Sequence, residues 1–145
     1  MTKQLNKKGT SLVELIAVIV IMGIIAGIAI PTTIAVINRQ KRNAALKSAQ
    51  AVFDAAKSAL LEASTGESIS YVDAEDGGYK TTSTALANAS EIEKDPSDTD
   101  CVMTIHYVLG TSTDPAYYYA SFTDDYTING IGIAWDSTKK ELKLA

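Results

Sequence analysis

An apolar run from Leu12 to Ile30, broken only by Glu14, constrains this chain more than any other feature. Its length approaches the roughly 20 residues that an α-helix needs to cross a bilayer. A carboxylate inside such a helix costs on the order of 2.5–3.5 kcal/mol even on lenient insertion scales. Glu14 therefore needs a partner, and we expect none within the intact chain.

A cut after Gly9 would supply such a partner. The new α-amino group of Thr10 would lie four residues before Glu14, one helical turn away on the same face. At about 4 Å and an effective dielectric near 20, the attraction between the two charges is roughly 4 kcal/mol, comparable to the insertion cost. The spacing therefore favours a charge pair between Thr10 and Glu14 after processing.

The residues around this position resemble a known family. The chain has two lysines before Gly9, in Lys7–Gly9, and then the segment Thr10–Leu15, whose fifth residue is Glu14. This pattern is similar to the processing site and helix start of type IV prepilins and of the major pseudopilins. The resemblance covers the leader and about thirty residues beyond it. It implies that a prepilin peptidase cuts after Gly9 and methylates Thr10, although the family usually has Phe at the position of Thr10.

The helix is expected to continue well beyond the apolar run. Apolar residues in steps of three and four form one stripe on the helix. They are Ala45, Ala49, Val52, Phe53, Ala56 and Leu60. This stripe predicts an amphipathic helix as far as Ser64, with Gly66 as its stop. We divide the chain into a leader (1–9), an N-terminal helix (10–64, with 10–31 for the membrane or filament core and 32–64 amphipathic) and a head (65–145).

Gly23, Gly27 and Pro31 mark the apolar half of the helix as a place for flexibility. Proline removes an amide donor and clashes with the carbonyl four residues back, here that of Gly27. In lipid, neighbouring groups can preserve the helix, whereas in a filament the segment could stretch or melt. The alternative is an ordinary proline kink. The spacing of Gly23 and Gly27 also permits close contact with another helix.

The head is predicted to be an antiparallel sheet laid across the helix, which makes the chain an α+β protein. Apolar residues alternate from Cys101 onward and predict strands at 102–109, 117–122, 126–135 and 141–144. Asn129-Gly130 predicts a tight turn or a bulge. The acidic segment 67–100 is expected to be turn-rich, with a short helix at 84–93. The family resemblance implies the same arrangement, a long helix on a small sheet.

The residue types of the head offer little catalytic chemistry. With one histidine, one cysteine and no phosphate-binding loop, we expect no enzyme and no cofactor. His106 is predicted to be a half-buried strand residue. Asp95, Asp98 and Asp100 do not have EF-hand spacing, so we expect a solvated loop and no metal; a calcium site is the alternative. The tyrosines 117–119 are expected to cover a sheet face, with an adhesive patch as the alternative.

The charge of the head excludes one class of partner. Between Gly66 and Asp136 there are thirteen acidic residues against Lys80 and Lys94. Binding of nucleic acid needs clustered Lys and Arg, so we expect none. Acidic heads on a filament surface would instead keep it soluble. Cys101 is the only cysteine, so no disulfide forms within the chain.

The resemblance implies a structural subunit of a type IV pilus. Such a subunit enters the cytoplasmic membrane as a single-pass precursor and is cut by prepilin peptidase. A platform protein and an ATPase then assemble it into an extracellular homopolymer for adhesion, twitching motility or biofilm. One alternative is a pseudopilin of a type II secretion or competence system. Another, of a different class, is a membrane-anchored surface binding protein.

The processing site leads to a first prediction. Gly9→Val should block the cut, because a branched side chain crowds the peptidase site, and the uncut chain should stay in the membrane. N-terminal sequencing of the native protein should begin at Thr10. A start after Ala29, or an intact Met1, would contradict the prepilin hypothesis.

Overall fold

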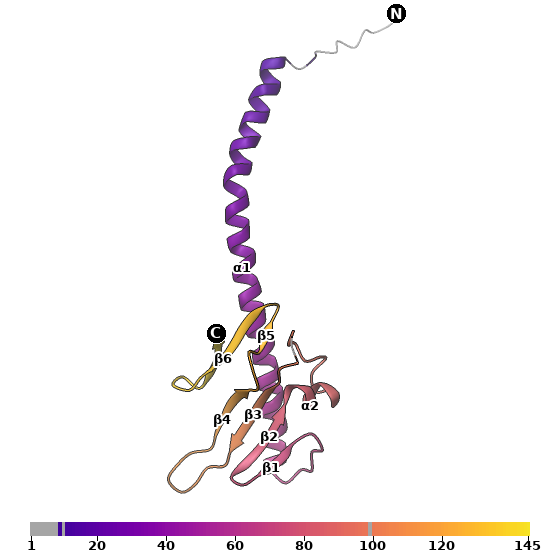
Figure 1. The fold of residues 1–145 in the computed structure, drawn as a ribbon, viewed down its shortest axis with the longest axis vertical. Coiled ribbons are helices and arrows are strands. Elements are labelled where there is room, and N and C mark those ends of the chain that lie inside the picture. The colour runs from indigo at the N-terminus through magenta and orange to yellow at the C-terminus, as the bar shows by residue number, and fades with distance from the viewer. Residues whose placement is uncertain (1–8, 10, 99) are drawn as a thin grey trace, which may run out of the picture. The chain divides into compact units, whose positions relative to one another are not determined.

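The computed structural model describes residue 9, residues 11–98 and residues 100–145. The fold is α+β: a long helix α1 (Leu12–Ser64) and antiparallel sheets on which its C-terminal part packs (Figure 1). The chain divides into two compact units, Met1–Arg39 and Gln40–Ala145.

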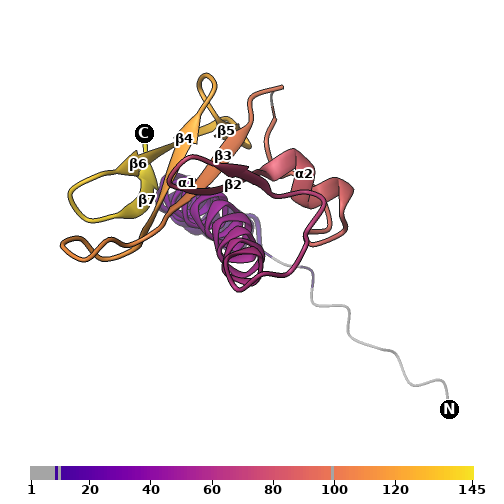
Figure 2. The same cartoon turned by 90° about the horizontal axis from the view of Figure 1, so that it is seen from below.

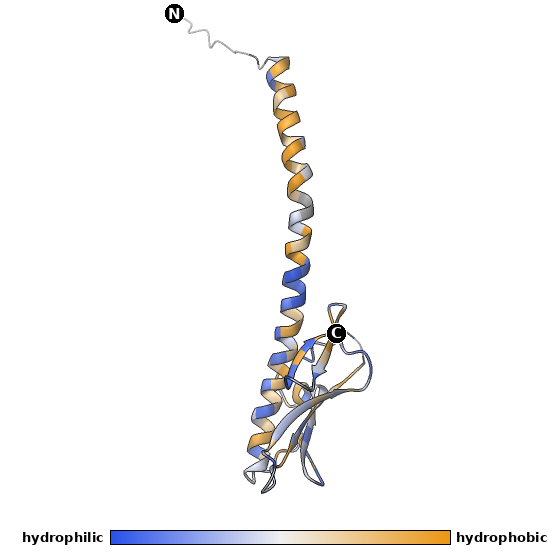
Figure 3. Cartoon of the chain, turned by 90° about the vertical axis from the view of Figure 1, so that its left-hand side faces the viewer, coloured by the Kyte–Doolittle hydropathy of each residue, from blue (hydrophilic) through white to orange (hydrophobic). Residues whose placement is uncertain are grey.

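The first half of α1 is apolar on every side. The large apolar side chains whose burial the structure describes there are exposed, from 44% at Ile37 to 72% at Leu12 and Val13. Figure 3 shows this apolar stretch followed by a hydrophilic band that corresponds to 38–43. Among the described residues, α1 is the one helix long and apolar enough to cross a membrane. A helix that is apolar all round requires an apolar environment around it.

The second half of α1 buries the predicted stripe. Ala45, Ala49, Ala56 and Leu60 are fully buried, and Phe53 packs half-buried against the same core. The helix ends as predicted at Gly66, which has a φ of +98°. Only glycine adopts this left-handed conformation without steric cost, so the residue closes the helix.

A four-stranded antiparallel sheet forms the larger layer of the head. Its order follows the sequence: β1 (Asp73–Glu75), β2 (Gly78–Thr82), β3 (Met103–Val108) and β4 (Tyr117–Phe122). Helix α2 (Ser83–Asn88) connects β2 to β3 and is shorter than predicted, because the chain turns at Ser90, whose φ is +63°.

The expectation that 67–100 is mostly turns was wrong at its start, where β1 and β2 form a hairpin. Its turn contains Gly77, whose φ is +97°. Gly78 is also required, since a Cβ there would overlap the carbonyl oxygen of Tyr107 on the neighbouring strand. These two glycines indicate a hairpin in the sequence, although the acidic composition of the segment favours a loop.

The last three strands form a second small sheet, in the order β5 (Thr127–Ile128), β6 (Ile131–Asp136) and β7 (Glu141–Leu144). One continuous strand at 126–135 was predicted, and this was wrong. The chain turns at Asn129 and Gly130, whose φ values are +52° and +70°. Positive φ at both positions is typical of the type I′ hairpin turn, so the tight-turn alternative is the correct one.

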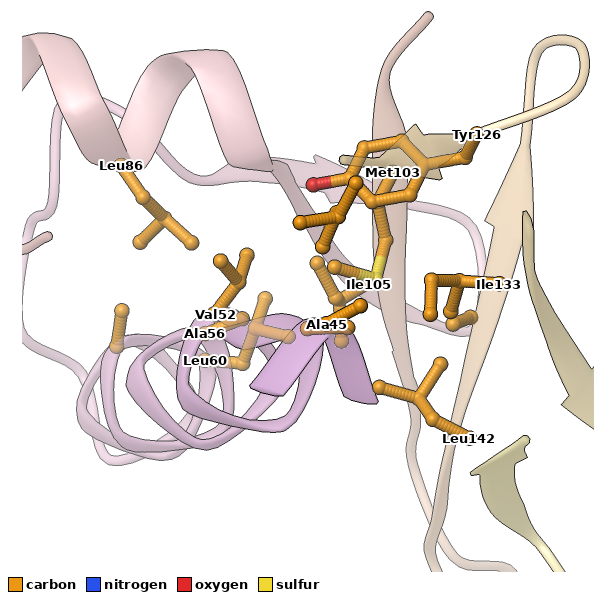
Figure 4. Close-up of a cluster of buried hydrophobic side chains, with 14 residues drawn as sticks. Ala45, Val52, Ala56, Leu60, Leu86, Met103, Ile105, Tyr126, Ile133 and Leu142 are labelled. Atoms are coloured by element: carbon orange, nitrogen blue, oxygen red, sulfur yellow. The ribbon is translucent and has the colours of Figure 1, made fainter. Parts of the chain in front are cut away.

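The core of the head lies between α1, α2 and both sheets. Figure 4 shows Leu86 of α2 and Met103 and Ile105 of β3 directed toward the α1 stripe, with Tyr126, Ile133 and Leu142 completing the cluster. The view along α1 in Figure 2 shows the sheet and α2 covering one side of the helix. Every buried side-chain nitrogen or oxygen of the described residues has a hydrogen-bond partner.

Two neighbouring leucines on α1 allow a matched test of this packing. Leu60 is fully buried and Leu61 is 52% exposed. Leu60→Ala should lower the free energy of unfolding by about 2–5 kcal/mol, because it leaves a cavity. Leu61→Ala should change it by less than about 0.5 kcal/mol. Urea unfolding of the full chain in detergent, followed by the fluorescence of the single tryptophan, measures both; equal effects would contradict the packing of this stripe.

Candidate processing and assembly site

Gly9 is exposed, and a Cβ built on it would have no atom within 4 Å. Folded structure therefore does not require glycine at this position. Thr10 lies outside the described residues. Cleavage between Gly9 and Thr10, methylation of Thr10 and its pairing with Glu14 stay predictions.

Glu14 has a partner within the chain, which corrects the expectation from the sequence. The backbone N–H of Ser11 donates to Oε2 of Glu14 at 3.0 Å. The N–H of Leu15 donates to the carbonyl of Ser11, also at 3.0 Å, so Ser11 is the N-cap of α1 and Glu14 its third helical residue. This bond is one half of a capping box. The Ser-x-x-Glu spacing is visible in the sequence and could have predicted it.

Capping alone does not offset the cost of Glu14 in a membrane. An N-cap interaction is worth about 0.5–2 kcal/mol, whereas the charge costs on the order of 2.5–3.5 kcal/mol to insert. An ionised carboxylate accepts up to about four hydrogen bonds, so the bond from Ser11 leaves capacity for another partner. Glu14 can therefore serve as a cap and still bind a cationic group.

The two glycines of α1 are not explained by packing within the chain. A Cβ at Gly23 or Gly27 would meet no atom within 4 Å. Each glycine costs the helix about 1 kcal/mol relative to alanine. The reason for glycine therefore lies either in flexibility or in close contact with another molecule.

The helix continues through Pro31, where one backbone donor is missing. In the same turn, the hydroxyls of Thr32 and Thr33 both donate to the carbonyl of Ala29, at 2.9 and 2.8 Å. Hydroxyl bonds of this kind share a carbonyl with the backbone hydrogen bonds of the helix and often bend it. The flexibility predicted for Gly23, Gly27 and Pro31 stays a prediction.

The acidic loop of the head is tied to the second sheet by two aspartates. Oδ1 of Asp95 accepts from the hydroxyl of Tyr126 at 2.9 Å and from the N–H of Ser97 at 3.1 Å. Oδ2 of Asp98 accepts from the N–H of Gly130 at 2.7 Å. These carboxylates hold the loop against the β5–β6 hairpin. No group of three or more metal-ligating side chains occurs among the described residues.

His106 lies half-buried in β3, as predicted. Its ring stacks on that of Tyr119 in β4, with centroids 4.4 Å apart and planes within 1°. Its Nε2 lies 3.0 Å from the hydroxyl of Ser121. Burial lowers the pKa of His106, so the neutral form is favoured. These contacts fix the ring in the sheet.

Comparison with protein-family models, curated proteins and solved structures finds no match to this chain.

The tyrosine contacts predict a loss of stability at alkaline pH. Burial and the hydrogen bond to Glu91 raise the pKa of Tyr71 to about 12, and burial and the charge of Asp95 raise the pKa of Tyr126. The unfolded value is about 10. Folding therefore favours the protonated forms, and stability that is present below pH 10 is lost as the pH rises further.

Tyr126→Phe tests whether the hydroxyl of Tyr126 causes part of the alkaline loss of stability. The variant should be less stable at pH 8 by about 1 kcal/mol, because the bond to Asp95 is lost. Between pH 8 and pH 11 it should lose less stability than the unsubstituted chain. Tyr117→Phe, at an exposed position, is the control and should show the full alkaline loss in urea unfolding. An undiminished loss in Tyr126→Phe would contradict the assignment.

Proposed function

We propose that this chain is a structural subunit of a type IV pilus, made as a single-pass membrane precursor and polymerised through the apolar half of α1. The observation that carries the proposal is the order of features along the N-terminus. A basic leader and Gly9 precede Glu14 at the helix start, and Glu14 precedes a helix whose apolar side chains are exposed in the single chain.

The exposed apolar half of α1 supports both the membrane-inserted precursor and the polymerised subunit of this proposal. Leaving a Val, Leu or Ile side chain in water forfeits roughly 1.5–3 kcal/mol, and α1 exposes such residues over several consecutive turns. A bilayer satisfies them before assembly, and a bundle of like helices satisfies them afterwards. Transfer between the two environments gains little hydrophobic energy, since lipid tails are as apolar as leucine.

Specific contacts must therefore decide assembly. Gly23 and Gly27 allow a second helix to approach closely, because nothing in the single chain fills the space beside them. Glu14 adds a charge that a cationic partner can satisfy, and the amine of Thr10 on a neighbouring subunit is the partner we propose. The prepilin peptidase, the assembly platform and its ATPase follow from the family resemblance.

The proposal places the mature protein on the cell surface, in filaments that serve adhesion, twitching motility or biofilm formation. A pseudopilin of a secretion or competence system would use the same N-terminal features. A membrane-anchored binding protein would use the apolar half of α1 as a simple anchor and would have no need of a pairing charge at Glu14.

Two substitutions of Glu14 separate charge pairing from helix capping. Gln at this position can still accept the N–H of Ser11, whereas Ala cannot. If Glu14 pairs with an amine in the filament, Glu14→Gln and Glu14→Ala should both leave membrane insertion and cleavage largely intact and both reduce filaments strongly. The reason is that the partner amine would be left unpaired in a low-dielectric core, at a cost of a few kcal/mol.

Filaments counted by electron microscopy and cleaved subunits measured in the same cells give the result. Filaments in Glu14→Gln but not in Glu14→Ala would show that capping is the role of Glu14. Normal filaments in both variants would contradict any assembly role. Cells with cleaved wild-type subunits and no filaments would favour a membrane anchor.

A further inference from the structure

Two hollows on the head have neighbouring linings, which share Tyr117 and Lys140. The first has a volume of about 320 Å³ and is lined by Tyr117, Tyr118, Tyr119, Trp135, Ser137 and Lys140. The second, about 400 Å³, shares Tyr117 and Lys140 and extends along the β3–β4 loop past Leu109, Asp114 and Pro115. Figures 1 and 2 both show the β3–β4 and β6–β7 loops on the same side of the head. We call the two hollows the aromatic groove.

The first hollow is lined mainly by aromatic side chains, of which Tyr117 is exposed and the others are half-buried, whereas the second has polar and apolar lining in about equal parts. Outside the first half of α1, the large apolar side chains that are exposed are Leu61, Leu109 and Tyr117, and two of these three line the groove. Trp135 is held by Phe53, with ring centroids 5.3 Å apart. Tyr118 stacks on Tyr107 at 4.6 Å. Rigid Tyr and Trp side chains offer contact area at a low cost in conformational entropy.

The groove also has a hydrogen-bond donor and a hydrogen-bond acceptor among its side chains. The ammonium of Lys140 lies 5.2 Å from the centroid of the Tyr117 ring. The ion pairs of the β6–β7 hairpin use Lys139 and Lys143, and Lys140 has no carboxylate within 4 Å among the described residues. Asp114 contributes a carboxylate, so the lining has one cation and one anion. An ionic ligand is therefore not favoured.

The backbone of β4 adds a donor and an acceptor at the groove. Thr123 N–H donates to the carbonyl of Val102, which lies on the β3 side. Because backbone groups alternate in direction along an antiparallel strand, the N–H and C=O of Tyr118 point away from β3. β4 is the last strand of its sheet, so no described strand pairs with this edge.

These features match a ligand with flat apolar faces and an edge of hydroxyl groups, which is the chemistry of a pyranose ring. Each hollow is within the size range of small-molecule sites, about 300–1,000 Å³. A proline-rich peptide also binds aromatic grooves. Its proline residues lack N–H groups, however, and offer no donor to the Tyr118 carbonyl or to the remaining acceptor capacity of the Asp114 carboxylate, whose Oδ2 accepts from the hydroxyl of Thr113 at 3.3 Å. Sugar hydroxyls both donate and accept, and they satisfy all of these groups.

We propose that the aromatic groove binds a neutral oligosaccharide, with sugar rings against Tyr117 and Trp135 and hydroxyls bonded to Lys140, Asp114 and the Tyr118 backbone. The site belongs to the head alone. It goes beyond the proposed pilus function and does not depend on it, because binding can be measured on protein that has not assembled.

Trp135 is the only tryptophan of the chain and reports on the groove directly. The full chain, in an amine-oxide detergent without a sugar headgroup, is titrated with neutral tetrasaccharides of glucose, galactose, mannose and N-acetylglucosamine. At least one should change the Trp135 emission saturably at micromolar to millimolar concentration. Failure of all four, or an equal response to a proline decamer, would overturn the proposal.

Matched variants test the location. Tyr117→Ala should weaken binding by about tenfold or more, as expected when an aromatic anchor is truncated, while Tyr117→Phe should retain most of it because the ring remains. Lys140→Ala should weaken binding severalfold, and the neighbouring Lys139→Ala should leave it within twofold. Circular dichroism of each variant checks folding. Unchanged binding in Tyr117→Ala would overturn the site.

Discussion

The apolar side chains of α1 meet two different requirements along one continuous helix. From Gln40 to Ser64 they form a single stripe that is buried against the sheets of the head, and the polar faces remain in water. From Leu12 to Arg39 they surround the helix and are exposed. The first pattern is satisfied by folding, whereas the second is satisfied only by lipid or by other protein. Our functional hypothesis depends on this difference.

Much of the fold could be predicted because the dominant signals are local and periodic. The stripe from Ala45 to Leu60 has a helical period over several turns, and Gly66 ends it, so the long helix and its buried face were correct. Strands β3 and β7 alternate cleanly, β4 is rich in aromatic residues, and all three were predicted to within a residue. The errors lie where the glycines of a tight turn occur within a segment whose composition indicates something else. Strand β1 is acidic and exposed, and the Asn129-Gly130 turn lies inside an apolar run.

The candidate site could be predicted only in part. Gly9, Glu14 and the apolar run are recognisable from residue types and spacing alone. The hydrogen bond from Ser11 to Glu14 depends on the position of the carboxylate in the first helical turn, whereas its charge alone predicts only the need for a cationic partner. Of the aromatic groove, the sequence indicates only the tyrosines 117–119, because the packing of two hairpins is what brings Trp135 and Lys140 to Tyr117.

The two edge strands of the four-stranded sheet, β1 and β4, differ in length and charge, and β4 is the edge that borders the groove. Exposed edges are usually blunted by short length and by charge, which prevent pairing with other chains. β1 follows this rule, with three exposed residues that include Asp73 and Glu75. β4 does not, because its six residues, Tyr117–Phe122, contain no charge. An uncharged edge of this length carries a risk of aggregation. Occupation of the groove beside Tyr118 by a ligand would cover part of that edge and would explain why aromatic side chains, and not lysines, stand there.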